Sequence, residues 1–151
     1  MDNRLQVRNG LSVILSDTVD IPKTIYSVGS ATSTVSNQLN DTGANFANVM
    51  PGFIVYNTTD STCTLVVAKL SDTSLLLADD IIANGENYTL YSVGINNGSL
   101  LYVGTGGDLT VMTLGGDVVT LRNYNDGQFV PIHVTRVFST GTTASDIVAL
   151  W

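Results

Sequence analysis

The side chains that could perform chemistry are few in this chain and stand far apart. Its one histidine, His133, lies in the alternating run PIHVTRV, and its one cysteine, Cys63, lies in TCTLVV. A zinc site or a nucleophile–base pair needs several such groups close together, and neither residue has a second group nearby in the sequence. We therefore expect His133 to face solvent or an interface, on the side of its strand opposite Val134. Cys63 is expected to be a small core residue, because free cysteine is commonly buried.

Neither the acids nor the glycines form a catalytic pattern. Asp79 and Asp80 are the only adjacent carboxylates. A glycosidase needs two carboxyls placed across a sugar-binding cleft, so we expect these two to lie in a solvated loop. The GTGG run at residues 104–107 is followed by an alternating strand, and lacks the helix that would aim backbone N–H groups at a phosphate; we expect a turn. The G-x-S-x-G, H-E-x-x-H and EF-hand spacings are absent. The sequence predicts no catalytic, cofactor-binding or metal site, and a protein that is not an enzyme.

Aromatic residues offer a different kind of site. Tyrosine rings can stack on sugars, but tyrosine also belongs naturally in β-strands. We therefore expect most members of the following set to be packing residues: Tyr56, Tyr88, Tyr91, Tyr102 and Tyr124.

Charge and composition exclude further classes of function. The net charge is −7, with six scattered basic residues, whereas tight nucleic-acid binding needs several cations on one surface. No run approaches the roughly 20 apolar residues of a membrane span. The start, MDNRLQVRNG, has no signal-peptide pattern, so we expect synthesis in a cytoplasm without classical export. With one cysteine, an internal disulfide is excluded, and stability must come from packing or assembly.

Short β-favouring runs separated by turn residues predict an all-β fold. TCTLVVAKL, SDT and SLLLA read as a hairpin, followed by an Asn84-Gly85 turn and the strand YTLYSVGI. DLTVMTL, GGD and VVTLR read as a second hairpin, followed by an Asp126-Gly127 turn and the strand FVPIHVTRVF. Such spacing predicts an antiparallel β-sandwich or a jelly-roll-like barrel.

The predicted organisation is an extended N-terminal arm followed by one β domain. Residues 1–50 dilute their apolar positions with Ser, Thr, Asn and Gly, so we expect an arm, with a short hairpin in LQVRNGLSVIL. Residues 51–151 should form the β-sandwich domain. Within it, residues 51–98 and 99–151 repeat the same order of lead-in, hairpin, turn and long strand. They are either related halves or consecutive hairpins that mimic a repeat.

The final run, IVALW, is apolar on both faces of the predicted strand. Alternation puts Ile147, Ala149 and Trp151 on one side and Val148 and Leu150 on the other. A strand of this kind needs the core on one face and a second layer or a neighbouring subunit on the other. We therefore take Ile147, Val148, Leu150 and Trp151 as candidate interface residues, and expect removal of Leu150 and Trp151 to weaken folding or assembly.

The stretch SLLYVGTGGDLTVMTLGGDVVTLRNYNDGQFVPIHVTRVFSTGTTASDIVALW resembles the C-terminal module of the head spike base proteins of tailed phages and gene transfer agents. The resemblance covers residues 99–151, about a third of the chain. The matching segments are residues 101–104, 107–112, 115–117, 130–137, 139–144 and 147–151. Residues 1–98 depart from short members of that family, and His133 stands where a more basic residue is expected.

This resemblance implies a non-enzymatic virion protein on the capsid exterior, either a decoration or cement protein or the base of a head spike. The implied partners are the major capsid protein, further copies of the chain in a trimer or pentamer, and a spike fibre protein. No cofactor, nucleic acid or membrane is implied. The alternative is a receptor- or carbohydrate-binding module of a phage tail fibre or baseplate, with an envelope-degrading glycosidase as a weaker rival.

Overall fold

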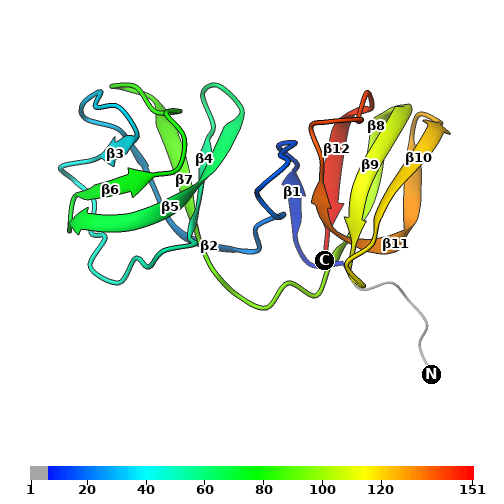
Figure 1. Cartoon of the computed structure of the whole chain (residues 1–151), viewed down its shortest axis with the longest axis horizontal. Helices are drawn as coiled ribbons and strands as arrows, with labels where there is room; N and C mark the ends of the chain where they lie inside the picture. The colour runs from blue at the N-terminus through cyan, green and yellow to red at the C-terminus, as the bar shows by residue number, and fades with distance from the viewer. Residues whose placement is uncertain (1–6) are drawn as a thin grey trace. The chain divides into compact units, whose positions relative to one another are not determined.

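The computed structural model describes residues 7–151, and each regular element in that range is a β-strand (Figure 1). The strands form two six-stranded antiparallel sheets, which confirms the predicted all-β fold class. Within the described part of the chain, no helix is long and apolar enough to cross a membrane. The chain divides into two compact units. Unit 1 contains the described residues up to Ile21 together with Asn96–Trp151, and unit 2 is Pro22–Ile95.

The sheet of unit 1 has the order β1-β12-β8-β11-β9-β10. Valine and leucine side chains from alternate positions of these strands fill its core, with Leu101, Val111 and Val130 fully buried. The strands are β1 (Gly10–Ser12), β8 (Ser99–Thr105), β9 (Gly107–Thr113), β10 (Val118–Tyr124), β11 (Gln128–Val137) and β12 (Ser145–Leu150).

The GTGG run makes a corner between two strands that are not neighbours in the sheet. β11 lies between β8 and β9 and pairs with both of them. A Cβ atom on Gly106, the single residue between β8 and β9, would overlap the carbonyl oxygen of Tyr124, and one on Gly104 would lie 2.8 Å from the Asp146 carbonyl oxygen. The backbone approaches too closely here for any side chain. The run is therefore a strand corner with a steric requirement for glycine.

The first described residues belong to unit 1 and do not form part of a free arm. β1 pairs with β12, with Gly10 opposite Leu150. The hairpin predicted in LQVRNGLSVIL begins at Leu5, outside the described residues, and its second half pairs with β12 instead. Farther along, the Ile21 N–H donates to the Thr135 carbonyl oxygen at 2.8 Å.

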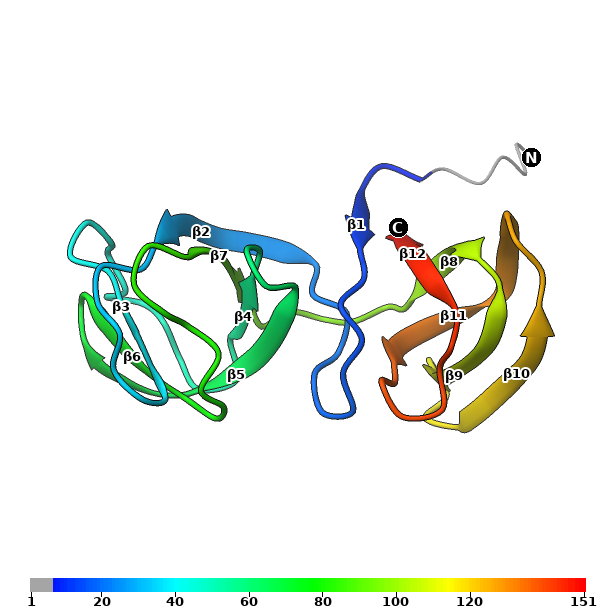
Figure 2. The same ribbon diagram turned by 90° about the horizontal axis from the view of Figure 1, so that it is seen from above.

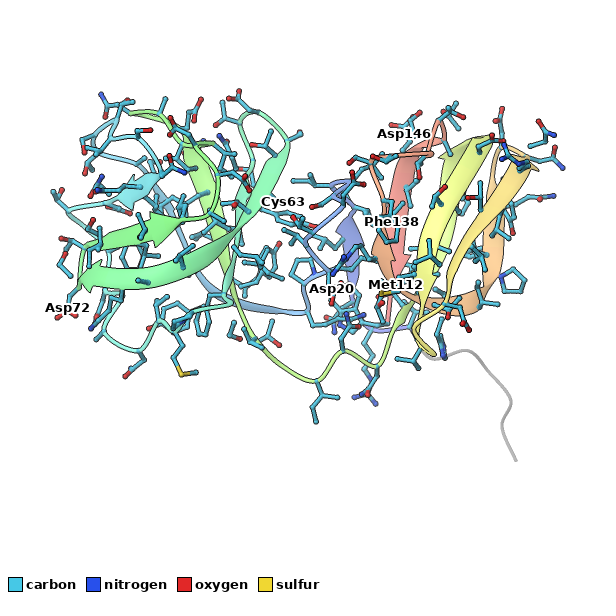
Figure 3. All side chains as sticks on the ribbon, in the orientation of Figure 1. Asp20, Cys63, Asp72, Met112, Phe138 and Asp146 are labelled. Carbon is cyan, nitrogen blue, oxygen red and sulfur yellow. The ribbon has the colours of Figure 1, made fainter. Side chains whose placement is uncertain are left out.

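Arg136 on β11 fixes the segment that follows β1. Its Nε donates to Asp20 Oδ1 at 2.7 Å, and its Nη1 donates to the Asp17 carbonyl oxygen at 3.0 Å. Asp20 and Phe138, labelled in Figure 3, lie beside this guanidinium, which sits 5.6 Å from the Phe138 ring centre. The Asp17 carboxylate accepts from the Thr140 hydroxyl and N–H, and these bonds lower the pKa of Asp17.

The sheet of unit 2 has the order β2-β7-β4-β5-β6-β3 and is strongly curled (Figure 2). Just beyond the end of β2, the Thr32 N–H donates to the Asn40 carbonyl oxygen of β3 at 2.7 Å, and Ser33 forms an isolated bridge with Asn40. The strands are β2 (Thr24–Ser30), β3 (Gln38–Asn40), β4 (Ile54–Asn57), β5 (Thr62–Ser71), β6 (Ser74–Leu77) and β7 (Asn87–Ser92).

Residues 22–50 are part of unit 2, which corrects the expectation of an arm. Leu39 and Phe46 are completely buried in its core, and Val49 is 5% exposed. A few apolar residues are enough to attach this segment to the core, because its polar side chains form hydrogen bonds within unit 2. For example, the Asp41 carboxylate caps the Gly43 N–H at 2.8 Å and accepts the Tyr88 hydroxyl at 2.7 Å.

The predicted hairpins are present, but the two halves of residues 51–151 do not share one topology. β5 pairs with β6, and β9 pairs with β10, as expected from their turns. In unit 2, however, the lead-in strand β4 lies beside β5, whereas in unit 1 the long strand β11 separates the lead-in strand β8 from β9. The similarity is therefore one of strand order along the chain, and the sheet orders differ.

Candidate functional site

The predicted interface residues of β12 lie on both sides of the sheet of unit 1. Ile147 and Ala149 belong to the core, and Trp151 is partly buried against the same core. The alternation predicted from IVALW is thus correct. Val148 and Leu150 point to the opposite side, which leaves these two as the members of the predicted set available to a second layer.

Neighbouring strands extend this apolar patch. Val148 lies opposite Tyr102 of β8, and Tyr102 lies opposite Phe129 of β11. The Tyr102 and Phe129 rings pack edge to face with their centres 5.3 Å apart. We call the set Leu100, Tyr102, Phe129, Val148 and Leu150 the outer face of unit 1. Since Leu101, Val130 and Ala149 fill the core beneath it, the sheet is apolar on both faces in this part of β8, β11 and β12.

The outer face of unit 1 carries no charge, although the chain as a whole is acidic. Phe129 is 56% exposed, and the other four side chains are half-buried. A large exposed aromatic ring within an uncharged apolar patch is typical of a protein interaction surface. The interface role itself stays a prediction.

Unit 2 also carries apolar side chains on the side of its sheet away from its core. One cross-strand row runs from Ile25 through Tyr91 to Ile54, and the next row runs from Val28 through Thr89 to Tyr56. At the β2 edge, Ile25 and Val28 are 60% and 68% exposed. Tyr91, Ile54 and Tyr56 in these rows are buried, so the exposed apolar side chains of the two rows are those of β2.

The last two residues are held by backbone bonds as well as by packing. The Arg8 and Asn9 N–H groups each donate to the Trp151 carbonyl oxygen at 2.9 Å, and the Trp151 N–H donates to the Asn9 carbonyl oxygen at 3.1 Å. Removing Leu150 and Trp151 therefore deletes these hydrogen bonds, removes Leu150 from the outer face of unit 1, and removes the Trp151 ring that packs against the core.

We expect this truncation to lower the midpoint of thermal unfolding far more than a surface substitution, whose effect is within about 0.5 kcal/mol. Thermal melts of the truncated and full chains measure it, with Val118→Ala on the edge strand β10 as the surface control. An unchanged melting midpoint and an unchanged oligomer mass after truncation would contradict this prediction.

His133 and Cys63 lie in different units, His133 in unit 1 and Cys63 in unit 2. His133 is exposed on β11 while Val134 is fully buried, as predicted. Cys63, labelled in Figure 3, was expected in the core but is half-buried on the outer side of β5. Thr64 takes the inward position instead, because its hydroxyl donates to Asp79 Oδ2 at 2.7 Å and accepts the Asp79 N–H.

Asp79 and Asp80 serve as anchors for the loop after β6. Asp79 binds Thr64, and the Asp80 carboxylate accepts the Asn37 N–H at 2.9 Å and the Ser36 hydroxyl at 3.0 Å. Both aspartates are exposed, as predicted for a loop. Their carboxylates are directed to separate partners and do not form a pair.

Sequence reasoning missed a different pair of acids, Asp60 and Glu86. Both line a pocket of about 340 Å³ in unit 2. The buried Asn57 side chain binds both of them: its Oδ1 accepts the Asp60 N–H at 3.1 Å, and its Nδ2 donates to Glu86 Oε2 at 2.8 Å. No local spacing relates them, because Asp60 lies in the β4–β5 turn and Glu86 comes just before β7. Across residues 7–151, no group of three or more His, Cys, Asp or Glu side chains could hold a metal ion.

The tyrosines considered for sugar stacking are engaged in packing or hydrogen bonding. Tyr56 and Tyr91 pack against each other at 5.3 Å, and Tyr102 packs on Phe129. Tyr88 is buried with its hydroxyl on Asp41, and the Tyr124 hydroxyl donates to the Phe129 carbonyl oxygen at 2.7 Å.

Among residues 7–151, ion pairs within one unit join Lys69 with Asp72, Arg122 with Asp108, and Arg136 with Asp20. These pairs reduce the positive charge that the chain could offer to a phosphate backbone. No protein-family model, curated protein or solved structure matches this chain.

Proposed function

We propose that this chain is a non-enzymatic virion structural protein, which decorates or cements the exterior of a tailed-phage capsid or forms the base of a head spike. The observation that carries the proposal is the outer face of unit 1. It is built by β8, β11 and β12, and all three strands lie in residues 99–151, the segment that resembles the spike base proteins. Covering the second apolar face of such a sheet with another protein layer removes apolar surface from water, which stabilises the complex.

The proposed mechanism is stabilisation of the shell by preferential binding. A protein that binds the assembled shell more tightly than free capsid subunits shifts the equilibrium towards assembly. Several copies joined in one oligomer would also bind simultaneously, which multiplies a modest affinity per site. The proposed partners are other copies of this chain, in a trimer or pentamer, and the major capsid protein, with a fibre protein in the case of a spike base.

The rival proposal, a carbohydrate- or receptor-binding module of a tail fibre or baseplate, draws less support. It needs tyrosine rings open to a sugar, whereas Tyr56, Tyr88 and Tyr91 are buried. Of the two half-buried rings, Tyr102 packs against Phe129 and Tyr124 donates its hydroxyl to the Phe129 carbonyl oxygen. The outer face of unit 1 is instead apolar and uncharged. Such a surface suits contact with another protein better than contact with the hydroxyl groups of a sugar.

Phe129→Lys tests the assembly surface directly. Phe129 is mostly exposed in the single chain, so the substitution should leave the melting temperature of a monomer nearly unchanged, while placing a charge in the centre of the proposed interface costs several kcal/mol on assembly. We expect the mass of the purified protein, measured in solution, to fall from an oligomer to a monomer.

Val118→Lys is the matched control for this experiment. Val118 is equally exposed at 56%, but it lies on the edge strand β10, away from the outer face of unit 1. Its oligomer mass should equal that of the unmodified chain. An oligomer that survives Phe129→Lys argues against this surface, and stepwise dissociation of particles that leaves the protein only with the tail argues against the capsid assignment.

A further inference from the structure

Among the edge strands of the two sheets, β2 combines length with the absence of charge. It lies beside β7 at one end of the sheet order of unit 2 (Figure 2). Its seven residues, TIYSVGS, include no charged side chain. Of the other edges, β1 and β3 have three residues each, and β10 carries Arg122. Because short length and charge protect a sheet edge against pairing, β2 is the edge within residues 7–151 that is best able to accept another strand.

Two large apolar side chains of β2 are exposed on the side of the sheet away from the core. Ile25 is 60% exposed and Val28 is 68% exposed. They lie opposite Tyr91 and Thr89, which are two positions apart on β7, although Ile25 and Val28 are three positions apart on β2. This extra residue in β2 is a β-bulge, and it places Ile25 and Val28 on the same face.

The two residues between them are directed towards the core. The Tyr26 ring packs edge to face on the buried Phe53, with the ring centres 5.4 Å apart. Ser27 lies opposite the fully buried Leu90. The side chains of residues 25–28 therefore point out, in, in and out, a pattern that reads the same in both chain directions.

The backbone groups of Ile25 and Val28 point to the open edge of β2. Just after this strand, the Ala31 N–H donates to the Glu86 carbonyl oxygen at 2.9 Å. Bonded and non-bonded residues alternate in an antiparallel pair, so every second residue counted back from Ala31 bonds to β7. Val28, three positions back, directs its N–H and C=O away from β7, and Ile25 on the same face does the same. Within residues 7–151, no backbone bond joins either of them to a strand other than β7.

We propose that β2 pairs in antiparallel fashion with β2 of a second copy of this chain, so that Ile25 of each copy lies opposite Val28 of the other. Two antiparallel copies match the pattern out, in, in, out at each of residues 25–28. The outward N–H and C=O groups of Ile25 then meet those of Val28, and each such pair exchanges both hydrogen bonds. A regularly alternating strand matches the bulge only by setting two residues against one, as β7 does.

Charge also favours a contact between copies at this strand. Each copy carries a net charge of −7, so two copies repel each other at most places on their surfaces. β2 is uncharged, and pairing gathers Ile25 and Val28 of both copies into one apolar cluster.

A single strand pair is a small contact, and interfaces of that size are weak. The pairing therefore forms only where copies are concentrated, and a dilute Phe129→Lys chain remains a monomer. On a capsid that carries many copies, the high local concentration would link neighbouring oligomers. This last consequence rests on the proposed function, whereas the pairing itself does not.

Sedimentation equilibrium over a series of rising protein concentrations tests the pairing. The Phe129→Lys chain is used, so that the outer face of unit 1 does not contribute. We expect its mass to rise from monomer to dimer with concentration. Adding Val28→Lys should abolish the rise, because each introduced lysine would lie against Ile25 of the other copy. Since Val28 is mostly exposed, the melting temperature should change little.

A charge exchange tests the register. Ile25→Glu alone should also abolish the dimer, whereas Ile25→Glu combined with Val28→Lys should restore it, because each introduced glutamate then faces an introduced lysine of the other copy. Val118→Lys, on the edge strand β10, is the matched control and should leave the dimer intact.

Three results would overturn the proposal: a Phe129→Lys chain that stays monomeric at high concentration, a dimer that survives Val28→Lys, or a double variant that does not dimerise. The outer face of unit 1 is tested in dilute solution, and β2 is tested by the rise of mass with concentration. Either proposal can therefore fail without the other.

Discussion

Gly106→Ala is expected to destabilise unit 1 by about 3 kcal/mol or more, the range of severe overpacking. The added methyl group would overlap the Tyr124 carbonyl oxygen and lie 2.9 Å from the Asn125 carbonyl carbon. Both obstacles are backbone atoms, so no side-chain rotation can relieve the clash. Opening the corner would displace β8 from β9 and disturb the pairing of β11 with both. Chemical denaturation of the two proteins measures the loss.

Gly115→Ala provides the control within the same unit. Gly115 lies in the β9–β10 turn, where an added Cβ would make ordinary contacts at 3.7 and 3.8 Å. We expect a change within about 1 kcal/mol, in the stabilising direction, because alanine restricts the unfolded chain. If Gly106→Ala and Gly115→Ala unfold at the same denaturant concentration, the steric account of the corner is wrong.

Tyr88→Phe is expected to cost unit 2 about 1.5 to 3 kcal/mol, the range for a hydrogen bond to a charged group. The Tyr88 hydroxyl is buried and donates to Asp41 Oδ2 at 2.7 Å, and Asp41 itself is only 8% exposed. The substitution leaves a buried carboxylate oxygen without its donor while keeping the aromatic ring in the core. Thermal or chemical unfolding at neutral pH measures the effect.

Alkaline unfolding separates loss of the hydroxyl from a general loosening of the core. Burial, followed by the bond to Asp41, raises the pKa of Tyr88 above its usual range. Folding therefore resists ionisation, and stability falls as pH rises beyond about 10, the ordinary pKa of tyrosine. Tyr88→Phe should flatten this fall, although Tyr91, whose pKa is also raised by burial, will retain part of it.

Tyr26→Phe is the control for Tyr88→Phe. The Tyr26 hydroxyl reaches the Asn45 carbonyl oxygen only at 3.5 Å and at an exposed position, so its loss should change stability by less than about 0.5 kcal/mol. Equal losses of unfolding free energy in the two variants would show that the buried Tyr88–Asp41 hydrogen bond stabilises the protein no more than the exposed Tyr26 contact does.

The parts of the fold that could be predicted from the sequence are those with strong local signals. The hairpins β5–β6 and β9–β10 follow from apolar runs interrupted by Ser-Asp-Thr and Gly-Gly-Asp. The alternation of β12 likewise follows from period-two geometry. In each case, neighbouring residues alone determine the element.

The arm was mispredicted because the stability of β2 and β3 depends on partners distant in sequence. β2 pairs with β7, and β3 pairs with β6. Their own residues are mostly polar, so composition indicates a segment with little to bury. The core positions Leu39 and Phe46 gain their value only from strands that lie later in the chain.

The candidate sites show the same limit. Val148 and Leu150 could be assigned to an outer side because strand alternation is local, whereas the rest of that face comes from β8 and β11. Asp60 and Glu86 gave no sequence signal at all, since a buried asparagine brings them together. Cys63 was misplaced because hydrophobicity favours cysteine over threonine in a core, and the Thr64–Asp79 bonds that reverse this preference are tertiary.

Unit 1 is built from two segments that lie far apart in the sequence, and this determines the order in which the units can fold during synthesis. Unit 2 is a continuous segment, so it can fold as soon as Ile95 has left the ribosome. β1 emerges first but has to wait for β12, which ends 138 residues later; at 5 to 20 residues per second this takes roughly 7 to 28 seconds. Throughout that interval the earliest strand has no sheet to join. A unit 2 that is already folded separates this strand from the nascent β8–β11 region, so the slowest step in maturation is expected to be the late closure of a long loop.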